Sequence, residues 1–420
     1  MTRFLAYTSP ARGHLFPIVA TLLELRARGH EVAVRTLASE VGRMRELGFA
    51  AAPIAREIED LPFDDWKART PIGANKRVAA RMAARAEHEL RDLPAAIEAE
   101  RPDALLVDIS TMGAATVAEA GPLPWAQWTP YFTPVASGDA PPFGLGLHPR
   151  HDRIGRLRDA VVRRVALSGP ERLARRSLNE LRPRLGLPPV ASGFDHWAAA
   201  PLHLYFTAEP FEYPRSDWPA SFRLVGPGLW EPPADPPAWL GEIRRPLVLV
   251  TLSTEFQDDG KLARVALEAL AGDEYDVVVT TGSVDASSLD VPANARVERF
   301  LPHGPLVERA ACVVCHGGMG ITQKALAAGV PVCVVPFGRD QLEVAGHVTW
   351  CDAGVRLASE RLSAERLRAA VRRAIGKRAG AERVAQGFAA AGGARAAAGA
   401  LERLVSKATD GAPAAAYHGR

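Results

Sequence analysis

Residues 310–323 read AACVVCHGGMGITQ, and no other stretch limits the possible fold of this chain as strongly. The apolar, β-branched run 310–315 predicts a strand that is buried on both faces. Glycines then break the strand, and 321–328 resumes with helical composition before Gly329 ends the helix. The stretch therefore predicts a strand, a glycine-rich turn and a helix in that order.

A turn of this kind can bind phosphate. It presents bare backbone N–H groups at the positive end of a helix, and its glycines let a diphosphate approach the backbone closely. His316 and Thr322 could add side-chain donors. The alternative is a tight turn that binds nothing, because glycines alone do not specify a ligand.

A second apolar run, 330–336 (VPVCVVP), predicts the next buried strand. It ends in the polar loop 337–341 (FGRDQ), at the same carboxyl edge of the expected parallel sheet. Ligands of open parallel sheets bind at that edge, so the loop strengthens the case for a ligand at the glycine turn.

Size and charge narrow the class of protein. A chain of 420 residues is long enough for two α/β domains. Its 51 basic and 48 acidic residues nearly cancel, which argues against a nucleic-acid-binding protein. No apolar run approaches the ~20 residues of a membrane span, and no signal peptide is visible, so we expect a cytoplasmic protein.

The cysteines predict a core role. Four cysteines in a chain of this length do not make a disulfide framework. Cys312 and Cys315 have C-x-x-C spacing but lie within one apolar strand, and no second pair follows at zinc spacing. We interpret them as core thiols rather than as a metal or redox site.

The N-terminal region predicts a βαβ unit. Residues 4–8 form a strand, Pro17 opens a helix and 31–37 form the next strand. His14 lies in the turn between strand and helix. A helix N-terminus tends to keep a histidine neutral, as a general base must be. The alternative is a histidine that only helps to cap the turn.

Asp108 ends the apolar run 104–108 (ALLVD), which predicts a strand. At the carboxyl edge of a sheet this carboxylate could reach His14, orient its ring and stabilise the proton that the ring acquires. An equally open alternative is that Asp108 caps a following helix.

Two segments between the predicted strands remain open to more than one interpretation. Residues 137–152 are rich in Gly and Pro and form a candidate lid or acceptor wall. Residues 153–184 predict one or two helices dense in arginine. These helices are either an ordinary solvated face or a basic surface for a membrane or an acidic partner.

The proline-rich segment 226–237 (GPGLWEPPADPP) reads as an interdomain linker, after which strand and helix alternate again. We expect the following organisation: an N-terminal Rossmann-like domain at 1–225, a linker at 226–245, a C-terminal Rossmann-like domain at 246–380, a helix at 381–405 that returns to the N-terminal domain, and a disordered tail at 406–420.

Motifs along nearly the whole chain carry a resemblance to a known family. They are GHLFP at 13–17, RGHEV at 28–32, FLP at 300–302, HGGMG at 316–320, GVP at 329–331, Pro336, and Asp340 with Gln341. In this order and at these spacings, the chain resembles the nucleotide-sugar-dependent glycosyltransferases of the UDP-glucuronosyl/glucosyltransferase family. It looks most like the actinobacterial members that modify macrolides, enediynes and aromatic polyketides.

The resemblance implies a GT-B fold, in which two Rossmann-like α/β domains face each other across a cleft. It implies inverting transfer of a sugar from a UDP or dTDP donor to a hydroxyl of a hydrophobic natural product. It implies no cofactor, no metal and no nucleic-acid partner, in a monomer or homodimer. His14 would deprotonate the acceptor hydroxyl, and Asp108 would pair with His14.

The resemblance also implies donor-binding roles for residues of the C-terminal domain. These are phosphate contacts from Ser253 and Thr254, nucleobase contacts from Phe300 and Leu301, diphosphate contacts from His316, Gly318, Met319, Gly320 and Thr322, and sugar contacts from Asp340 and Gln341. Three positions depart from the family pattern: Ser253 replaces a glycine, Ile321 a threonine and Val344 an asparagine.

Two other functions fit the same scaffold. An epimerase or hydrolase of nucleotide sugars would turn over without an acceptor. A non-catalytic auxiliary protein of a partner glycosyltransferase would bind without turnover, although the intact His14, His316 and Asp340 argue against it. A nicotinamide oxidoreductase is disfavoured because no G-x-G-x-x-G follows the first strand.

Overall fold

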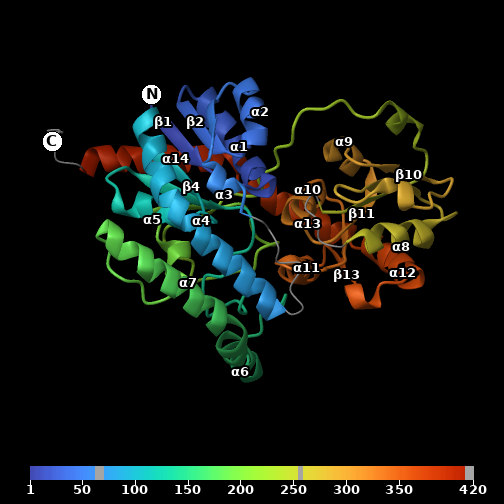
Figure 1. The fold of residues 1–420 in the computed structure, drawn as a ribbon. Helices are drawn as coiled ribbons and strands as arrows, with labels where there is room; N and C mark the ends of the chain where they lie inside the picture. Colours follow the sequence, from blue (N-terminus) through green and yellow to red (C-terminus); the bar gives the residue numbers. More distant parts are fainter. Residues whose placement is uncertain (62–70, 254–258, 412–420) are drawn as a thin grey trace.

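The structure is a computed structural model that describes residues 1–61, 71–253 and 259–411. Two β-sheets, whose paired strands all run parallel, lie side by side and are each covered by helices (Figure 1). The linker 226–245 joins the last strand of the first sheet to the first strand of the second. The predicted pair of Rossmann-like domains is confirmed.

The N-terminal sheet has the strand order β3-β2-β1-β4-β5-β6-β7. Its strands are β1 (Arg3–Tyr7), β2 (Glu31–Thr36), β3 (Ala50–Pro53), β4 (Ala104–Asp108), β5 (Trp125–Thr129), β6 (Leu202–Tyr205) and β7 (Phe222–Leu224). The helices of this half are α1 (Arg12–Ala27), α2 (Val41–Glu46), α3 (Arg56–Glu59), α4 (Pro71–Glu100), α5 (Met112–Ala120), α6 (Arg153–Val162) and α7 (Ser168–Leu181).

The C-terminal sheet has the order β10-β9-β8-β11-β12-β13. Its strands are β8 (Leu247–Thr251), β9 (Asp276–Thr280), β10 (Ala295–Glu298), β11 (Ala310–Cys315), β12 (Val332–Val334) and β13 (Gly354–Arg356). The helices that follow the linker are α8 (Gly260–Leu270), α9 (His303–Val307), α10 (Met319–Ala327), α11 (Gln341–Trp350), α12 (Ala364–Ile375), α13 (Arg378–Ala390) and α14 (Gly393–Gly411).

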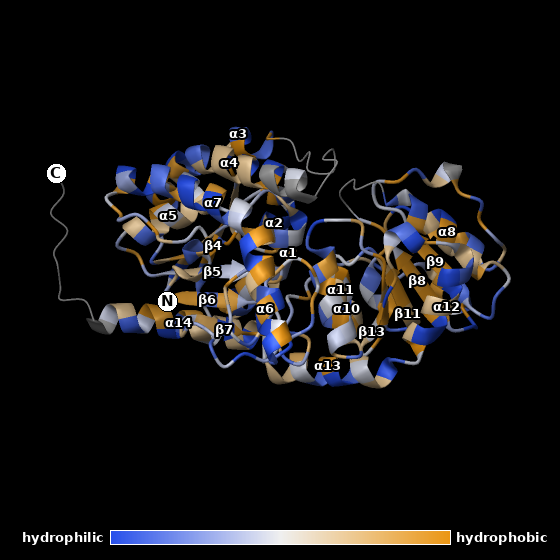
Figure 2. Ribbon diagram, turned by 90° about the horizontal axis from the view of Figure 1, so that it is seen from below, coloured by the Kyte–Doolittle hydropathy of each residue, from blue (hydrophilic) through white to orange (hydrophobic). Residues whose placement is uncertain are grey.

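Both sheets are buried on their two faces, as the continuous apolar strands predict. In β1, Phe4 and Ala6 belong to the cluster that α1 and α14 cover, whereas Leu5 and Tyr7 belong to the cluster on the opposite face. Alternate side chains of a strand point to opposite faces, so a helix layer on each side requires apolar residues at every position. The orange sheet strands in Figure 2 show this pattern.

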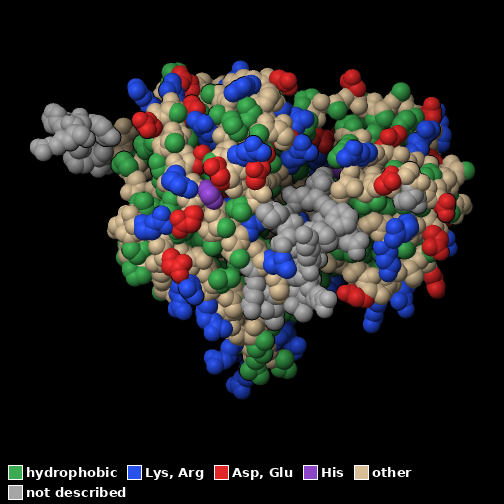
Figure 3. All heavy atoms as spheres, in the orientation of Figure 1, with side chains coloured by type: hydrophobic (Ala, Val, Ile, Leu, Met, Phe, Trp, Pro, Cys, Tyr) green, Lys and Arg blue, Asp and Glu red, His purple; other side chains and the backbone are tan. Residues whose placement is uncertain are grey.

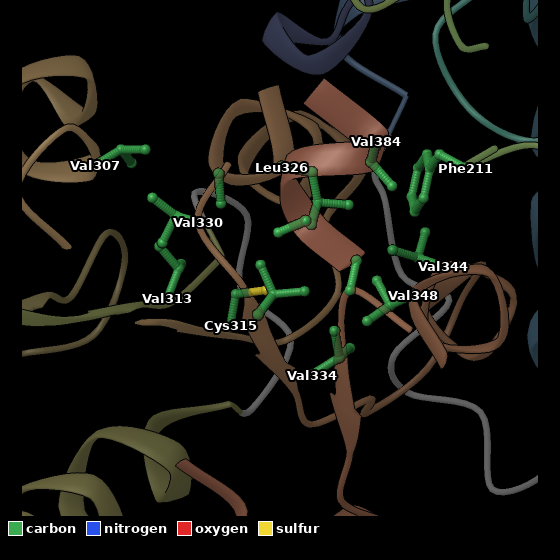
Figure 4. Close-up of a cluster of buried hydrophobic side chains, with 14 of the residues drawn as sticks. Phe211, Val307, Val313, Cys315, Leu326, Val330, Val334, Val344, Val348 and Val384 are labelled. Carbon is green, nitrogen blue, oxygen red and sulfur yellow. The ribbon is translucent and has the colours of Figure 1, made fainter. Parts of the chain in front are cut away.

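The C-terminal core extends to the N-terminal half of the chain. Figure 4 shows Val313, Cys315 and Val334 from the sheet beneath Leu326 of α10. Phe211, from the loop after β6, joins the same cluster. The two domains therefore share buried apolar surface, which fixes their relative position.

The cysteines lie in the core. Cys312 and Cys315 are fully buried free thiols on β11, and Cys333 and Cys351 are also buried and free. Burial raises the pKa of the Cys312 and Cys315 thiols, which keeps them protonated and inert. This is the core environment that the sequence predicted for the C-x-x-C pair.

The last helix closes the N-terminal half. α14 packs against α1 and passes behind α4 in the view of Figure 1. The predicted tail at 406–420 is wrong in its first part, because α14 continues to Gly411. Extending an existing helix adds one backbone bond per residue at little cost, and the Thr409 hydroxyl also donates to the Val405 carbonyl at 2.8 Å. Residues 412–420 lie outside the described part of the chain.

No helix among the described residues is both long enough and apolar enough to cross a membrane.

A buried carboxylate joins α4 to α5. Glu89 is fully buried, and its Oε2 accepts the backbone N–H of Gly113 at 2.8 Å and of Ala114 at 3.3 Å, in the first turn of α5. The helices meet closely, since a Cβ on Gly113 would lie 2.3 Å from the Ala86 carbonyl oxygen. Burial outweighs these hydrogen bonds and raises the pKa of Glu89 from 4.5 to about 8.

We predict that Glu89→Gln removes a pH dependence of stability. Between pH 4.5 and about 8 the folded protein keeps a proton that the unfolded chain loses, so the wild-type free energy of unfolding falls as pH rises through that window. Denaturant titrations across the window should show a flatter profile for Glu89→Gln. Glu87→Gln, a half-exposed site on the same helix, is the control. A profile for Glu89→Gln as steep as that of wild type would contradict the prediction.

Candidate active site

The structure brings His14 and Asp108 together. β1 and β4 are parallel neighbours, with Tyr7 beside Val107, so their carboxyl ends meet. Asp108 is the last residue of β4, and His14 lies in the first turn of α1. The imidazole Nδ1 lies 3.0 Å from both carboxylate oxygens. The helix begins at Arg12, earlier than the predicted start at Pro17, so His14 is held by the helix itself.

Hydrogen bonds hold the Asp108 carboxylate in place. Ser9 donates to Oδ2 from its backbone N–H at 3.1 Å and from its hydroxyl at 3.0 Å, and the N–H of Ser110 donates to Oδ1 at 2.8 Å. Burial favours the neutral carboxyl, but His14 and these donors outweigh it and lower the pKa of Asp108. An ionised Asp108 holds the ring proton on Nδ1, which leaves Nε2 as the acceptor nitrogen of His14.

Aromatic residues line the surroundings of His14. The ring of Tyr131 lies edge-on to the imidazole at 5.3 Å and contacts the ring of Trp197 at 5.7 Å. The Tyr131 hydroxyl is 2.9 Å from the hydroxyl of Ser110. Tyr131 was not predicted from the sequence. Its position two residues after β5, at the sheet edge that carries Asp108, is the signal that could have identified it.

The glycine turn has the predicted form, with α10 beginning at Met319. Gly317 has φ +97°, and a Cβ there would lie 2.9 Å from Val334 Cγ1. A Cβ on Gly318 would lie 2.6 Å from His316 Nε2. Gly318, the N-cap of α10, has no side chain with which to cap the first N–H groups of the helix. The turn therefore offers a site for an anion.

His316 borders this turn with an unsatisfied nitrogen. Its side chain is buried, and its Nδ1 has no hydrogen-bond partner within the described ranges. Burial lowers the pKa of His316 to about 4, so the ring is neutral at physiological pH. A buried polar atom without a hydrogen-bond partner lowers the free energy of unfolding. A bound ligand that hydrogen-bonds to this atom would remove that penalty.

Thr322 lies differently from the other residues of the motif. It is fully buried, and its hydroxyl is 3.6 Å from the Cys315 sulfur on β11. The side chain thus faces the strand beneath the helix, a position that does not favour the predicted contact with diphosphate.

Asp340 and Gln341 lie against the glycine turn. A Cβ on Gly317 would come within 3.2 Å of Gln341 Cβ. Gln341 Oε1 accepts the N–H groups of Phe337 at 2.7 Å and Gly338 at 3.0 Å, which fixes the loop. Burial raises the pKa of Asp340, and attraction to Arg339 and His14 opposes the rise. Asp340 therefore lies close enough to His14 to interact with it across the domain boundary.

The remaining predicted donor residues lie farther along the same edge of the sheet. Ser253 follows β8, is buried, and donates its N–H to Asp259 Oδ2 at 2.7 Å. Thr254 lies outside the described residues. Phe300 follows β10 and is 56 % exposed, whereas Leu301 is half-buried. Two strands separate β10 from β11, so the Phe300 ring and His316 are at different ends of this edge.

A buried carboxylate joins the two domains beside this site. Glu343 lies in the first turn of α11, and its Oε2 accepts the N–H of Gly144 at 2.8 Å and of Gly146 at 3.0 Å. The contact is tight, because a Cβ on Gly146 would lie 1.9 Å from the Leu342 carbonyl oxygen. The loop 137–152, predicted as a lid or acceptor wall, is thus bound to the helix that begins with the Asp-Gln pair.

One turn further along α11, His347 completes this contact. Its ring stacks between Phe132 at 3.6 Å and Tyr213 at 3.7 Å, and its Nδ1 lies 2.7 Å from the Phe211 carbonyl oxygen. Glu343 and His347 were not predicted from the sequence. Their partners are about 130 to 215 residues away, and no local pattern marks such a pairing.

The chain resembles known proteins in sequence and in fold. Residues 264–404 match the family model for the erythromycin biosynthesis protein CIII-like C-terminal domain. The chain is 36 % identical to 4'-demethylrebeccamycin synthase of Lentzea aerocolonigenes over 369 residues, which are 84 % of this chain and 87 % of that protein.

Two solved structures share the fold. The calicheamicin glycosyltransferase CalG4 superposes with a TM-score of 0.74 at 21 % identity, over 97 % of this chain and 99 % of that one. The Streptomyces sp. SF2575 glycosyltransferase SsfS6, complexed with thymidine diphosphate, has a TM-score of 0.69 at 18 % identity, over 96 % and 100 % of the two chains.

The chain therefore belongs to the GT-B-fold glycosyltransferases of the UDP-glucuronosyl/glucosyltransferase family, as the motifs predicted. Within that family it resembles the actinobacterial enzymes of antibiotic biosynthesis.

We predict that Glu343→Ala destabilises the fold at the domain boundary. The substitution leaves the N–H groups of Gly144 and Gly146 buried without an acceptor, which should lower the free energy of unfolding by about 2–4 kcal/mol. Denaturant unfolding measures the loss. Glu180→Ala removes an exposed carboxylate of α7 and should change stability by less than about 0.5 kcal/mol. Equal effects of the two substitutions would show that the contact of Glu343 with Gly144 and Gly146 does not contribute to stability.

Proposed function

We propose that this protein transfers a sugar, with inversion, from a UDP or dTDP donor to a hydroxyl of a hydrophobic natural product. The observation that carries the proposal is the His14–Asp108 pair, which lies close to Asp340 at the meeting point of the two domains. An oriented imidazole in one domain and an anion site in the other supply the two halves of a displacement reaction.

His14 would act as the general base. Its Nε2 takes the proton of the acceptor hydroxyl as the oxygen attacks the anomeric carbon, and the bond from that carbon to the diphosphate breaks. Asp108 stabilises the imidazolium that results and keeps its orientation. A positioned base contributes roughly 10²–10⁴-fold to the rate.

The glycine turn would stabilise the leaving nucleoside diphosphate. The N-terminal amides of α10, at Met319 and Gly320, and the unsatisfied Nδ1 of His316 are fixed donors for the charge that develops there. Neutral His316 donates one hydrogen bond from Nδ1 if it carries its proton there. We propose that these donors take the place of a metal ion.

The rest of the donor would extend along the carboxyl edge of the C-terminal sheet. Asp340 would accept hydrogen bonds from the sugar hydroxyls, and Gln341 shapes the loop by accepting the N–H groups of Phe337 and Gly338. Ser253 and Thr254 would meet phosphate, and Phe300 and Leu301 would hold the nucleobase at the far end of the edge. The thymidine diphosphate bound by SsfS6 supports a dTDP donor.

The acceptor would bind beside His14, against residues of the N-terminal domain. The rings of Tyr131 and Trp197 and the loop 137–152 offer apolar and aromatic surface for a flat, hydrophobic molecule. The likeness to 4'-demethylrebeccamycin synthase supports an antibiotic-type acceptor. If turnover of the nucleotide sugar requires such an acceptor, the protein is a transferase rather than an epimerase, a hydrolase or a non-catalytic auxiliary protein.

We predict that His14→Ala loses sugar transfer by at least about 10²-fold and keeps its affinity for UDP or dTDP within a few-fold. The base acts only on the acceptor, from the domain opposite the phosphate turn. Initial rates and calorimetry with the nucleoside diphosphate measure the two effects. His151→Ala, at an exposed site, is the control. A large loss of nucleotide affinity in His14→Ala would contradict the assignment.

Transfer should also continue unchanged in excess chelator, because amides and His316 neutralise the leaving group. Rates measured with and without EDTA test this expectation. Activity that disappears with EDTA and returns on adding a divalent ion would exclude the metal-free mechanism.

A further inference from the structure

α6 and the π-helical turn 163–167 that follows it carry an exposed apolar stripe. Ile154, Leu157, Val161 and Val165 are 63 %, 67 %, 53 % and 73 % exposed. They are spaced three, four and four residues apart, so they line one face of the helix. Of the ten large hydrophobic side chains that are exposed among the described residues, these four lie together.

Arginines surround this stripe. Residues 153–164 contain five arginines and a single acidic residue, Asp159, whose carboxylate pairs with Arg158. The side chains of Arg153 and Arg164 are exposed and make no hydrogen bond or ion pair within the described ranges. They lie eleven residues apart, about three helical turns, so both border the same side of the stripe.

The opposite face of α6 is anchored to the protein. Asp152 caps the helix by accepting the N–H of Gly155 at 2.7 Å, and Gly155 is so close to the preceding loop that a Cβ would lie 2.1 Å from the Arg150 carbonyl oxygen. Arg158 donates to the His148 carbonyl at 3.0 Å, and Arg163 donates to that of Ser137. The stripe is therefore held facing outward.

α6 projects from the body of the molecule. It forms the lower end in Figure 1, and Figure 3 shows basic and hydrophobic side chains gathered on that projection. Figure 2, which looks at the molecule from this side, shows hydrophobic and hydrophilic bands along α6. A convex, projecting surface of this kind can approach a flat partner without obstruction by the rest of the chain.

We propose that α6 docks this protein on the surface of a membrane that contains anionic lipids. Aliphatic side chains on one face with arginines along the border are the pattern of a helix that lies in the plane of the headgroup region. The apolar stripe would enter the boundary between headgroups and acyl chains, and Arg153 and Arg164 would contact lipid phosphates. This proposal is independent of the proposed sugar transfer.

Other occupants fit the surface less well. A second copy of the chain would bring two arginine-rich faces together, and their charges repel. A protein partner would need an apolar groove with acidic residues along its rim. Arg is enriched among the residues that dominate protein interfaces, but Leu and Val, which form most of this stripe with Ile, are under-represented there. A bilayer surface satisfies both the apolar stripe and the positive border.

Vesicle flotation with the full chain tests the proposal. Wild type should float with phosphatidylcholine vesicles that contain about 30 % phosphatidylglycerol, and much less with pure phosphatidylcholine. Binding should weaken as salt rises from about 50 to 500 mM, because the charge contribution is screened. Leu157→Ser with Val165→Ser should weaken binding at least about tenfold, and Arg153→Gln with Arg164→Gln roughly 30-fold.

The control is Val291→Ser, which removes an exposed apolar side chain elsewhere on the surface and should leave binding unchanged. Circular dichroism shows that each variant is folded. The proposal is overturned if wild type floats with neither vesicle, if the control weakens binding as much as the α6 variants, or if the α6 variants bind as wild type does. Concentration-dependent dimerisation that the α6 variants abolish, without vesicle binding, would identify a second copy as the occupant.

Discussion

The contact between α11 and the N-terminal loop 137–152 is the interaction on which the arrangement of the site depends. Glu343 holds the loop through two backbone N–H groups, and His347 is stacked between two N-terminal aromatic rings. The same helix begins with the Asp340-Gln341 pair. One helix, α11, therefore begins with the residues proposed to bind the sugar and also holds the loop 137–152 of the N-terminal domain, where the acceptor is proposed to bind. Because a Cβ on Gly146 would collide with the Leu342 carbonyl oxygen, the loop and the helix are in close backbone contact.

Parallel sheet topology explains why the reactive groups come from distant parts of the chain. In each domain the strands end at one edge, and every turn that follows a strand presents its residues there. β1 and β4 bring His14 to Asp108, and β11 and β12 bring the glycine turn to the loop of Asp340. The two edges differ in chemistry. The first holds a carboxylate and an imidazole, which the proposed mechanism uses to move a proton, and the second offers amides and a neutral histidine, which it uses to bind an anion.

Local sequence patterns predict most of the fold but only part of the candidate site. The β-branched strands, the glycine turn and the position of Asp108 at a strand end were all predictable, because burial and backbone chemistry leave a local mark. The direction of the Thr322 side chain, toward a ligand or toward the strand beneath α10, was not predictable. A rotation of α10 about its axis by about a third of a turn decides it. Glu343 and His347 could not be found either, because their roles arise only from packing between elements that lie far apart in the chain.

Unfavourable burial of polar groups is found both at the site and in the core. Within the described ranges His316 is buried with a nitrogen that has no hydrogen-bond partner, and burial raises the pKa of Asp340, although neither arrangement improves the folded state. Glu89 is fully buried in the core, and its Oε1 has no partner among the described residues, but its Oε2 accepts hydrogen bonds from two amides of α5 and links two helices. A perturbed pKa alone thus does not mark function. What separates His316 and Asp340 from Glu89 is that they lie at the carboxyl edge of a parallel sheet, where a ligand can supply the missing partner.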